Sequence, residues 1–221
     1  MTMPSSAKWV GILTACGVKQ AAAVRWAPIF AAEIRDGTFS AGARELDDFL
    51  GQVLHESQML ERVEENLNYS VDGLLKTFGR HRISEADARR YGRIDGKQVA
   101  NRQAIANTVY GGEWGRKNLG NVEPDDGWVC RGSGLIQVTG LANLIALAKA
   151  TGWKGNPRDL GLALRSDPTT ALRISILWWE SKVPDSVMGD IVKVTKLVNG
   201  GANGLDDRSR LTAIAKKGLL A

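Results

Sequence analysis

The stretch that decides the fold is ELDDFLGQVLHES, residues 45–57. Its apolar side chains recur at positions i, i+3, i+4, i+7 and i+8, which predicts an amphipathic helix buried along one stripe. Glu56, near its end, falls beside that stripe, so we expect a half-buried carboxyl group whose charged form is disfavoured and which can act as a general acid. A helix acid paired with a nearby Lys or Arg is the competing interpretation. The apolar positions are Leu46, Phe49, Leu50, Val53 and Leu54.

A second glutamate, Glu65, follows soon after. On one unbroken helix it would lie about 13.5 Å further along and on the opposite side, where it could share no substrate with Glu56. Asn66, Asn68, Tyr69 and Ser70 are poor helix formers, however. We therefore expect the helix to end near residue 60 and the chain to fold back.

Helical periodicity dominates the rest of the chain. The start contains LTAC, which resembles a lipoprotein cleavage box at Cys16. Only about five apolar residues precede it, which is short for a secretory signal, so we predict a core-packing helix there. The other predicted elements are short helices and turns at 71–98, a helix at 102–111, a long ordered loop at 111–134, an extended GLIQVTG segment, and helices at 141–151, after Asp167-Pro168, over DIVKVTKLVNGG and at 206–217.

Length and composition predict a single domain over 1–221, with a smaller helical lobe at about 71–112 and no separate binding module. Lys and Arg outnumber Asp and Glu by 29 to 24, and the net charge of +5 favours an anionic partner such as nucleic acid, membrane or bacterial wall polymer. The chain has no nucleic-acid motif and no run of about 18 apolar residues, so neither nucleic-acid binding nor stable membrane insertion is expected. Cys16 and Cys130 are expected to be free thiols.

Other catalytic motifs fail on their spacing. HESQM has Met59 where a zinc-binding H-E-x-x-H needs its second histidine, and His81 has no companion, so no metal site is expected. GSGLIQ lacks the last glycine of a dinucleotide loop, and no Gly-x-Ser-x-Gly elbow occurs. Two carboxylates without a metal or a nucleophilic serine are what glycoside hydrolysis uses.

Five segments together resemble glycoside hydrolase family 19. They are HES at 55–57, ENLNYS, AIANTVYGG, DGWVCRGSGLIQVTG and VNGGANGLDDR, and the likeness covers about residues 45–217. The phage endolysin branch is the most similar part of the family. The resemblance implies a mostly α, lysozyme-like fold with a long substrate groove, and inverting hydrolysis of β-1,4 links between amino sugars without a cofactor.

The resemblance also implies roles for individual residues. Glu56 matches the general acid, Glu65 the base that activates water, with Glu64 as a nearby competitor, and Thr139 the hydroxyl that holds the water. The residues expected to bind substrate are Gln137, Asn143, Asn199, Arg131, Tyr69 and Trp128.

Several of these positions can also be explained by purely structural roles. Gln137 and Thr139 would be two residues apart on an extended backbone and could simply cap a strand end, while Asn199 before two glycines could be a helix C-cap. Trp114 and Trp128 have a better claim to contact a sugar than Trp178 and Trp179, which fall in the middle of an apolar helix.

The chain also departs from the family pattern. Cys130 and Ser133 replace an aromatic ring and a guanidinium, which puts one sugar subsite in question, and SQML follows Glu56 where glycines are common. We expect a monomeric peptidoglycan hydrolase that is made in the host bacterial cytoplasm and released to the wall by a holin-like membrane partner. Chitin hydrolysis, a lytic transglycosylase and a non-catalytic wall-binding protein are the alternatives.

Overall fold

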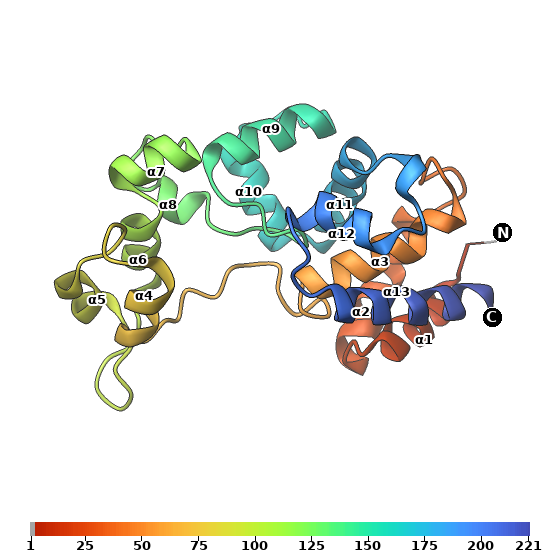
Figure 1. The fold of residues 1–221 in the computed structure, drawn as a ribbon, viewed down its shortest axis with the longest axis horizontal. Helices are drawn as coiled ribbons and strands as arrows, with labels where there is room; N and C mark the ends of the chain where they lie inside the picture. Colours follow the sequence, from red (N-terminus) through yellow and green to blue (C-terminus); the bar gives the residue numbers. More distant parts are fainter. Residues whose placement is uncertain (1–2) are drawn as a thin grey trace. The chain divides into compact units, whose positions relative to one another are not determined.

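The computed structural model describes residues 3–221 and is built of helices (Figure 1). Helices occupy 63% of the chain, and within the described residues only isolated β-bridges occur, which confirms the mostly α prediction. None of these helices is both long enough and apolar enough to cross a bilayer.

The chain forms two compact units. The first comprises residues 1–63, 134–137 and 163–221, and the second comprises residues 64–133 and 138–162, which includes the predicted lobe. α10 (Pro157–Ser166) begins in the second unit and ends in the first. The other helices of the first unit are α1 (Ser6–Cys16), α2 (Gln20–Glu33), α3 (Ala43–Glu56), α11 (Pro168–Lys182), the short 3-10 helix η1 (Asp185–Val187), α12 (Ile191–Asn199) and α13 (Leu205–Leu220).

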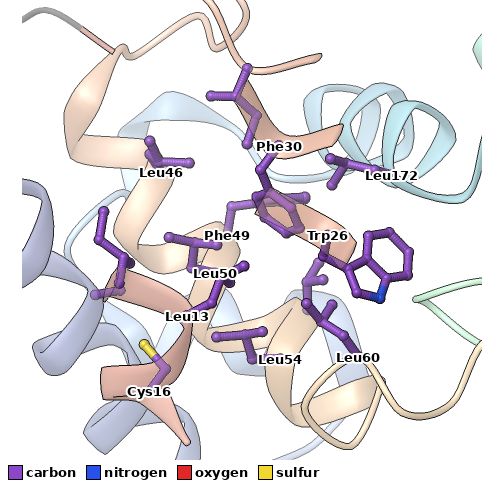
Figure 2. Close-up of a cluster of buried hydrophobic side chains, with 14 of the residues drawn as sticks. Leu13, Cys16, Trp26, Phe30, Leu46, Phe49, Leu50, Leu54, Leu60 and Leu172 are labelled. Carbon is purple, nitrogen blue, oxygen red and sulfur yellow. The ribbon is translucent and has the colours of Figure 1, made fainter. Parts of the chain in front are cut away.

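The apolar stripe of α3 forms the centre of the first unit's core. All five predicted stripe residues are at most 2% exposed, and α13 packs along α3 and α1. Figure 2 shows Leu46, Leu50 and Leu54 of α3 surrounded by side chains from other helices. The helix that carries Glu56 is therefore fixed by burial along its whole length.

The N-terminal prediction is confirmed. α1 begins after Ser5, whose hydroxyl accepts from the amide of Lys8, and ends at Gly17, whose left-handed φ of 106° suits glycine. Trp9 and Cys16 are fully buried in the core. The sequence analysis missed α2, which packs against α1 and α11.

The second unit is a cluster of short helices. Its apolar core includes Leu74, Phe78, Ile105 and Val109. The prediction of short helices at 71–98 and of a helix at 141–151 is confirmed. The helices are α4 (Val71–Phe78), α5 (Glu85–Tyr91), α6 (Arg102–Val109), α7 (Gly112–Leu119), α8 (Asp126–Val129) and α9 (Leu141–Thr151).

The predicted long loop at 111–134 is wrong, because it contains α7 and α8. The glycines that suggested a loop instead permit close backbone approach. A Cβ on Gly115 would lie 1.9 Å from the carbonyl oxygen of Tyr110, and one on Gly127 would lie 2.4 Å from that of Ala106. Both glycines therefore bring short helices together.

Helix ends in the C-terminal part follow the predicted signals. Asp167 accepts from the amides of Thr169 and Thr170 and caps α11, and Gly200 closes α12 with a left-handed φ of 72°. Trp179 of α11 is 1% exposed, as expected of a core residue. Cys16 and Cys130 are both buried, and neither forms a disulfide within the described residues.

Candidate active site

Glu56 is the last residue of α3, and its side chain is 26% exposed, which confirms the half-buried position. Its Oε1 accepts a 2.5 Å hydrogen bond from Nη2 of Arg208. The competing interpretation, a helix acid paired with an arginine, thus describes its contacts. Helix position alone predicted the burial of Glu56 but not the guanidinium of Arg208 beside it. The role of Glu56 in catalysis stays a prediction.

Arg208 is 1% exposed and is held by acceptors on several sides. Its Nη1 donates to Gln52 Oε1 at 2.5 Å, and its Nε donates to the carbonyl of Asn203 at 3.1 Å. Gln52 in turn donates to Thr195 Oγ1 at 3.1 Å. Because a buried guanidinium must have its donors satisfied, these contacts fix the group that faces Glu56.

Sequence reasoning missed Arg208, although a signal existed. Arg208, Leu211, Ala215 and Leu219 are spaced 3, 4 and 4 apart, so they share the buried face of α13. A charged residue on an otherwise apolar stripe needs a buried partner. That partner is Glu56.

A second polar pair is formed by the residues that immediately precede Glu56 in α3 and Arg208 in α13. His55 Nδ1 and Asp207 Oδ2 are 2.8 Å apart. The hydrogen bond from His55 lowers the pKa of Asp207. Residues 55 and 56 of α3 therefore pair in order with residues 207 and 208 of α13, which sets the rotation of α3 at the end that carries Glu56.

The chain turns sharply after Glu56. Gln58, Met59 and Leu60 have φ values of 49°, 59° and 63°, which is left-handed backbone that non-glycine residues rarely adopt. Ser57 Oγ accepts from the amide of Leu60 at 3.0 Å, and Leu60 is 1% exposed. The helix therefore ends about one turn before the predicted position, and burial of Leu60 holds a strained turn.

Glu65 belongs to the second unit and is half-buried. Its Oε1 accepts from the hydroxyl of Tyr110 at 2.5 Å, and its Oε2 accepts from the amide of Gly132 at 3.2 Å. Burial, followed by the charge of Glu65, raises the pKa of Tyr110. The phenol therefore keeps its proton and donates a hydrogen bond to the carboxyl group of Glu65. Two neutral donors, the Tyr110 hydroxyl and the Gly132 amide, thus hold Glu65.

Glu64 has a different environment. Its Oε1 accepts from both Nε and Nη2 of Arg131, at 2.9 and 2.6 Å. Arg131 also donates to the carbonyl of Trp128 at 2.6 Å, and its guanidinium lies 3.5 Å from the centre of the Trp128 ring. Two predicted substrate residues thus contact each other, and one face of the Trp128 indole is already covered.

The predicted extended segment over GLIQVTG is wrong. Gln137 has a left-handed φ of 51°, and both its amide and its Nε2 donate to the carbonyl of Gly134. Ser133 and Val138 form a single isolated bridge. The segment is a tight turn, so alternation along a strand cannot place Gln137 and Thr139 on one side.

The remaining predicted residues occupy ends of helices and loops. The carbonyl of half-buried Thr139, just before α9, accepts from Asn143 Nδ2 at 2.7 Å. Asn199 ends α12 and donates to the carbonyl of Asn203 at 3.5 Å. The ring of Tyr69 packs edge-on against Phe78, with centroids 5.2 Å apart. The substrate-binding roles of these residues stay predictions.

The first unit also contains a cavity of about 400 Å³ at the opposite end of α3. It is lined by Asp47, Asp48, Lys216 and several apolar side chains, and by none of the predicted site residues. Burial and the neighbouring Asp48 raise the pKa of Asp47 to about 6. In residues 3–221 no group of three or more His, Cys, Asp or Glu side chains could hold a metal ion.

Comparison with known proteins identifies the family. No family model matches the chain. A protein of Haemophilus influenzae described as a glycosyl hydrolase family 19 domain-containing protein is 36% identical over 163 residues, which is 74% of each chain. Chitinase C of Streptomyces griseus has a similar fold, with a TM-score of 0.54 at 17% identity over 98% of this chain and 92% of the other, and a glutamate-to-glutamine variant of chitinase C gives 0.51. At that identity over three quarters of its length, the chain belongs to glycosyl hydrolase family 19.

Proposed function

We propose that this glycoside hydrolase cuts the β-1,4 bonds in the glycan of bacterial peptidoglycan with inversion at the anomeric carbon. Glu56 gives a proton to the glycosidic oxygen, and Glu65 takes a proton from a water that Thr139 helps to hold. Such a reaction passes through an oxocarbenium-like transition state and uses two carboxyl groups on opposite sides of the sugar, about 6.5–9.5 Å apart.

The contrast between Glu64 and Glu65 carries the assignment of the base. Both hydrogen bonds to Glu64 come from a guanidinium and fall on one oxygen. Glu65 is held by the neutral donors Tyr110 and Gly132, and among residues 3–221 it forms no ion pair. Each oxygen of Glu65 has a second lone pair for a water, whereas Oε1 of Glu64 already accepts two hydrogen bonds from Arg131.

Arg208 faces the carboxyl group that we assign as the acid. A general acid begins protonated and ends as a carboxylate once its proton has moved to the leaving oxygen. The buried guanidinium lies on Oε1, where it stabilises the carboxylate that the transfer creates. Oε2, which accepts no hydrogen bond from Arg208, is the oxygen we assign to the proton.

The substrate is the second part of the proposal. The net charge of +5 suits an anionic wall polymer. Chitin is the second candidate, because the solved proteins of similar fold are chitinases. Purified peptidoglycan and chitin should be digested side by side and the products analysed by mass spectrometry. Reducing ends from peptidoglycan alone support the proposal, products from chitin alone favour the second candidate, and anhydro-sugar ends indicate a transglycosylase.

The stereochemistry needs its own measurement. Proton NMR of the first minutes of hydrolysis separates α- from β-anomeric products before they equilibrate. An α-anomer from a β-linked substrate supports inversion, and an initial β-anomer contradicts the two-carboxylate mechanism proposed here. A chain that binds the wall but leaves the glycan intact would be a wall-binding protein.

The biological setting completes the proposal. We infer synthesis in the cytoplasm of a bacterial host, action as a monomer, and access to the wall through a holin-like membrane partner. Expression in bacteria with and without a holin tests this, because lysis should require the holin. Lysis without it contradicts the need for that partner.

A further inference from the structure

Arg82 occupies an unusual place beside Glu65 in the second unit. Its guanidinium carbon lies 4.8 Å from the ring centre of Phe78, 5.2 Å from that of Tyr110 and 3.8 Å from that of Trp114. Three aromatic rings from α4, the end of α6 and α7 thus surround one cation. A cation over a ring face is attracted by the ring quadrupole, and the attraction grows as water is removed.

The same guanidinium holds the backbone that carries Tyr110. Nε of Arg82 donates to the carbonyl of Val109 at 2.9 Å, and Asn121 donates to the carbonyl of Tyr110 at 2.8 Å. Two side chains therefore fix consecutive carbonyls where α6 ends. The ring contact and the backbone contact together restrict the position of the Tyr110 hydroxyl, which donates to Glu65.

The guanidinium of Arg82 carries a desolvation cost. Nη2 is buried and, within residues 3–221, makes no hydrogen bond of ordinary geometry. Burial lowers the pKa of Arg82, while the nearby Tyr110 and Glu65 act in the opposite direction. An apolar side chain of similar length would fill the space between the rings without this desolvation. Such a side chain would lack the contacts of the guanidinium with the Tyr110 ring and the Val109 carbonyl.

We propose that Arg82 is a positioning residue for the reaction: it holds Tyr110 in place and, through the Tyr110 hydroxyl, positions the carboxyl group of Glu65 as the base. This inference rests on the proposed function of Glu65. The hydroxyl of Tyr110 transmits the effect, because it donates to the carboxylate while its ring is held by the guanidinium. Hydrogen bonds in such a series reinforce one another in a poorly hydrated site.

The other charged or titratable groups near Glu65 are few. Tyr69 acts electrostatically on both Arg82 and Tyr110. Glu64 and Arg131 flank the Gly132 amide that binds Glu65, and they pair with each other. The Arg131 charge is thus matched by Glu64, whereas Arg82 forms no ion pair in the described part of the chain, and Tyr110 and Glu65 both act electrostatically on it.

The test measures kcat, KM and stability for Arg82→Met. The variant keeps the length and apolar contact of the side chain but loses the charge and planar group. We expect kcat to fall about tenfold or more with KM little changed, because the base is then misplaced while the sugar still binds. Activity is expressed per folded molecule, because the lost hydrogen bond to the Val109 carbonyl also lowers stability. Arg90→Met is the matched control, since Arg90 lies 5.4 Å from the ring centre of Tyr91 and has no part in the site.

A double mutant tests the route through Tyr110. If Arg82 acts by holding Tyr110, Arg82→Met should cost nothing further in a Tyr110→Phe background. Additive losses, or an unchanged kcat in Arg82→Met, overturn the inference while leaving Glu65 as the base. Full activity of Glu65→Gln, measured in parallel, would instead remove the proposed function and this inference with it.

Discussion

The two glutamates assigned to the reaction are held in opposite ways. Glu56 stands at the end of a long buried helix and faces the buried guanidinium of Arg208. Glu65 lies outside any helix and faces the neutral hydroxyl of Tyr110 and the amide of Gly132. One carboxyl group thus has a cation that stabilises it once its proton has left, while the other is placed without neutralising its charge. The two carboxyl groups therefore differ in what holds them, a cation for Glu56 and neutral donors for Glu65.

The largest effect should come from removing either carboxyl group. Glu56→Gln and Glu65→Gln should each lower hydrolysis by about 10²–10⁴-fold, because general acid and base catalysis typically contributes that much. Turbidity assays on cell walls, normalised to folded protein by circular dichroism, measure this. Glu64→Gln is the control and should retain far more activity, since its carboxylate serves Arg131. Equal losses in all three variants would contradict the distinction between Glu64 and Glu65.

The next largest effect concerns the cation that faces Glu56. Arg208→Met should lower the free energy of unfolding by about 3 kcal/mol, because it leaves Glu56, Gln52 and the Asn203 carbonyl without their donor. Urea unfolding measures this. Arg210→Met is the control, because Arg210 is exposed and pairs with Asp207 at the surface, so its loss should cost under about 0.5 kcal/mol. Similar losses of unfolding free energy in both variants would mean that the buried pair stabilises the fold no more than the exposed pair does.

A third acid on α3 is held by neutral donors, and its pKa is raised. Glu45 is fully buried, accepts from Trp179 Nε1 and the amide of Ala41, and burial raises its pKa from 4.5 to about 7. The folded state therefore holds this proton more tightly than the unfolded chain, so stability should fall as pH rises from about 4.5 to about 7. Glu45→Gln should remove about 1–3 kcal/mol of that fall. Unfolding at pH 5 and pH 8 measures it, and an unchanged difference counts against the prediction.

The smallest effect concerns the turn that follows Glu56. Gln58 is exposed and left-handed, a conformation that costs an ordinary residue about 1–2 kcal/mol and glycine almost nothing. Gln58→Gly should therefore stabilise the protein by about 0.5–1 kcal/mol, after the greater entropy of glycine in the unfolded chain is subtracted. Gln103→Gly, inside α6, should destabilise it by about 1 kcal/mol. Thermal melting of both variants should show opposite signs.

Much of the first unit could be predicted locally. The stripe of α3, the cap at Asp167 and the closing glycine Gly200 depend on side chains within one or two turns of one another. In contrast, the glycines of residues 111–134 misled the prediction. Their role is to admit a neighbouring backbone, as at Gly115 and Gly127, and that neighbour cannot be read from the local pattern.

By itself, the sequence determined the mostly α fold, the buried face that carries Glu56 and the set of segments that resemble the family. Only the tertiary structure decided which side chain contacts each acid. The contacts of Glu56 with Arg208, of Glu64 with Arg131 and of Glu65 with Tyr110 span 152, 67 and 45 residues. Periodicity reports which face of a helix is buried, whereas the charge or hydroxyl opposite an acid comes from another part of the chain and is set by packing.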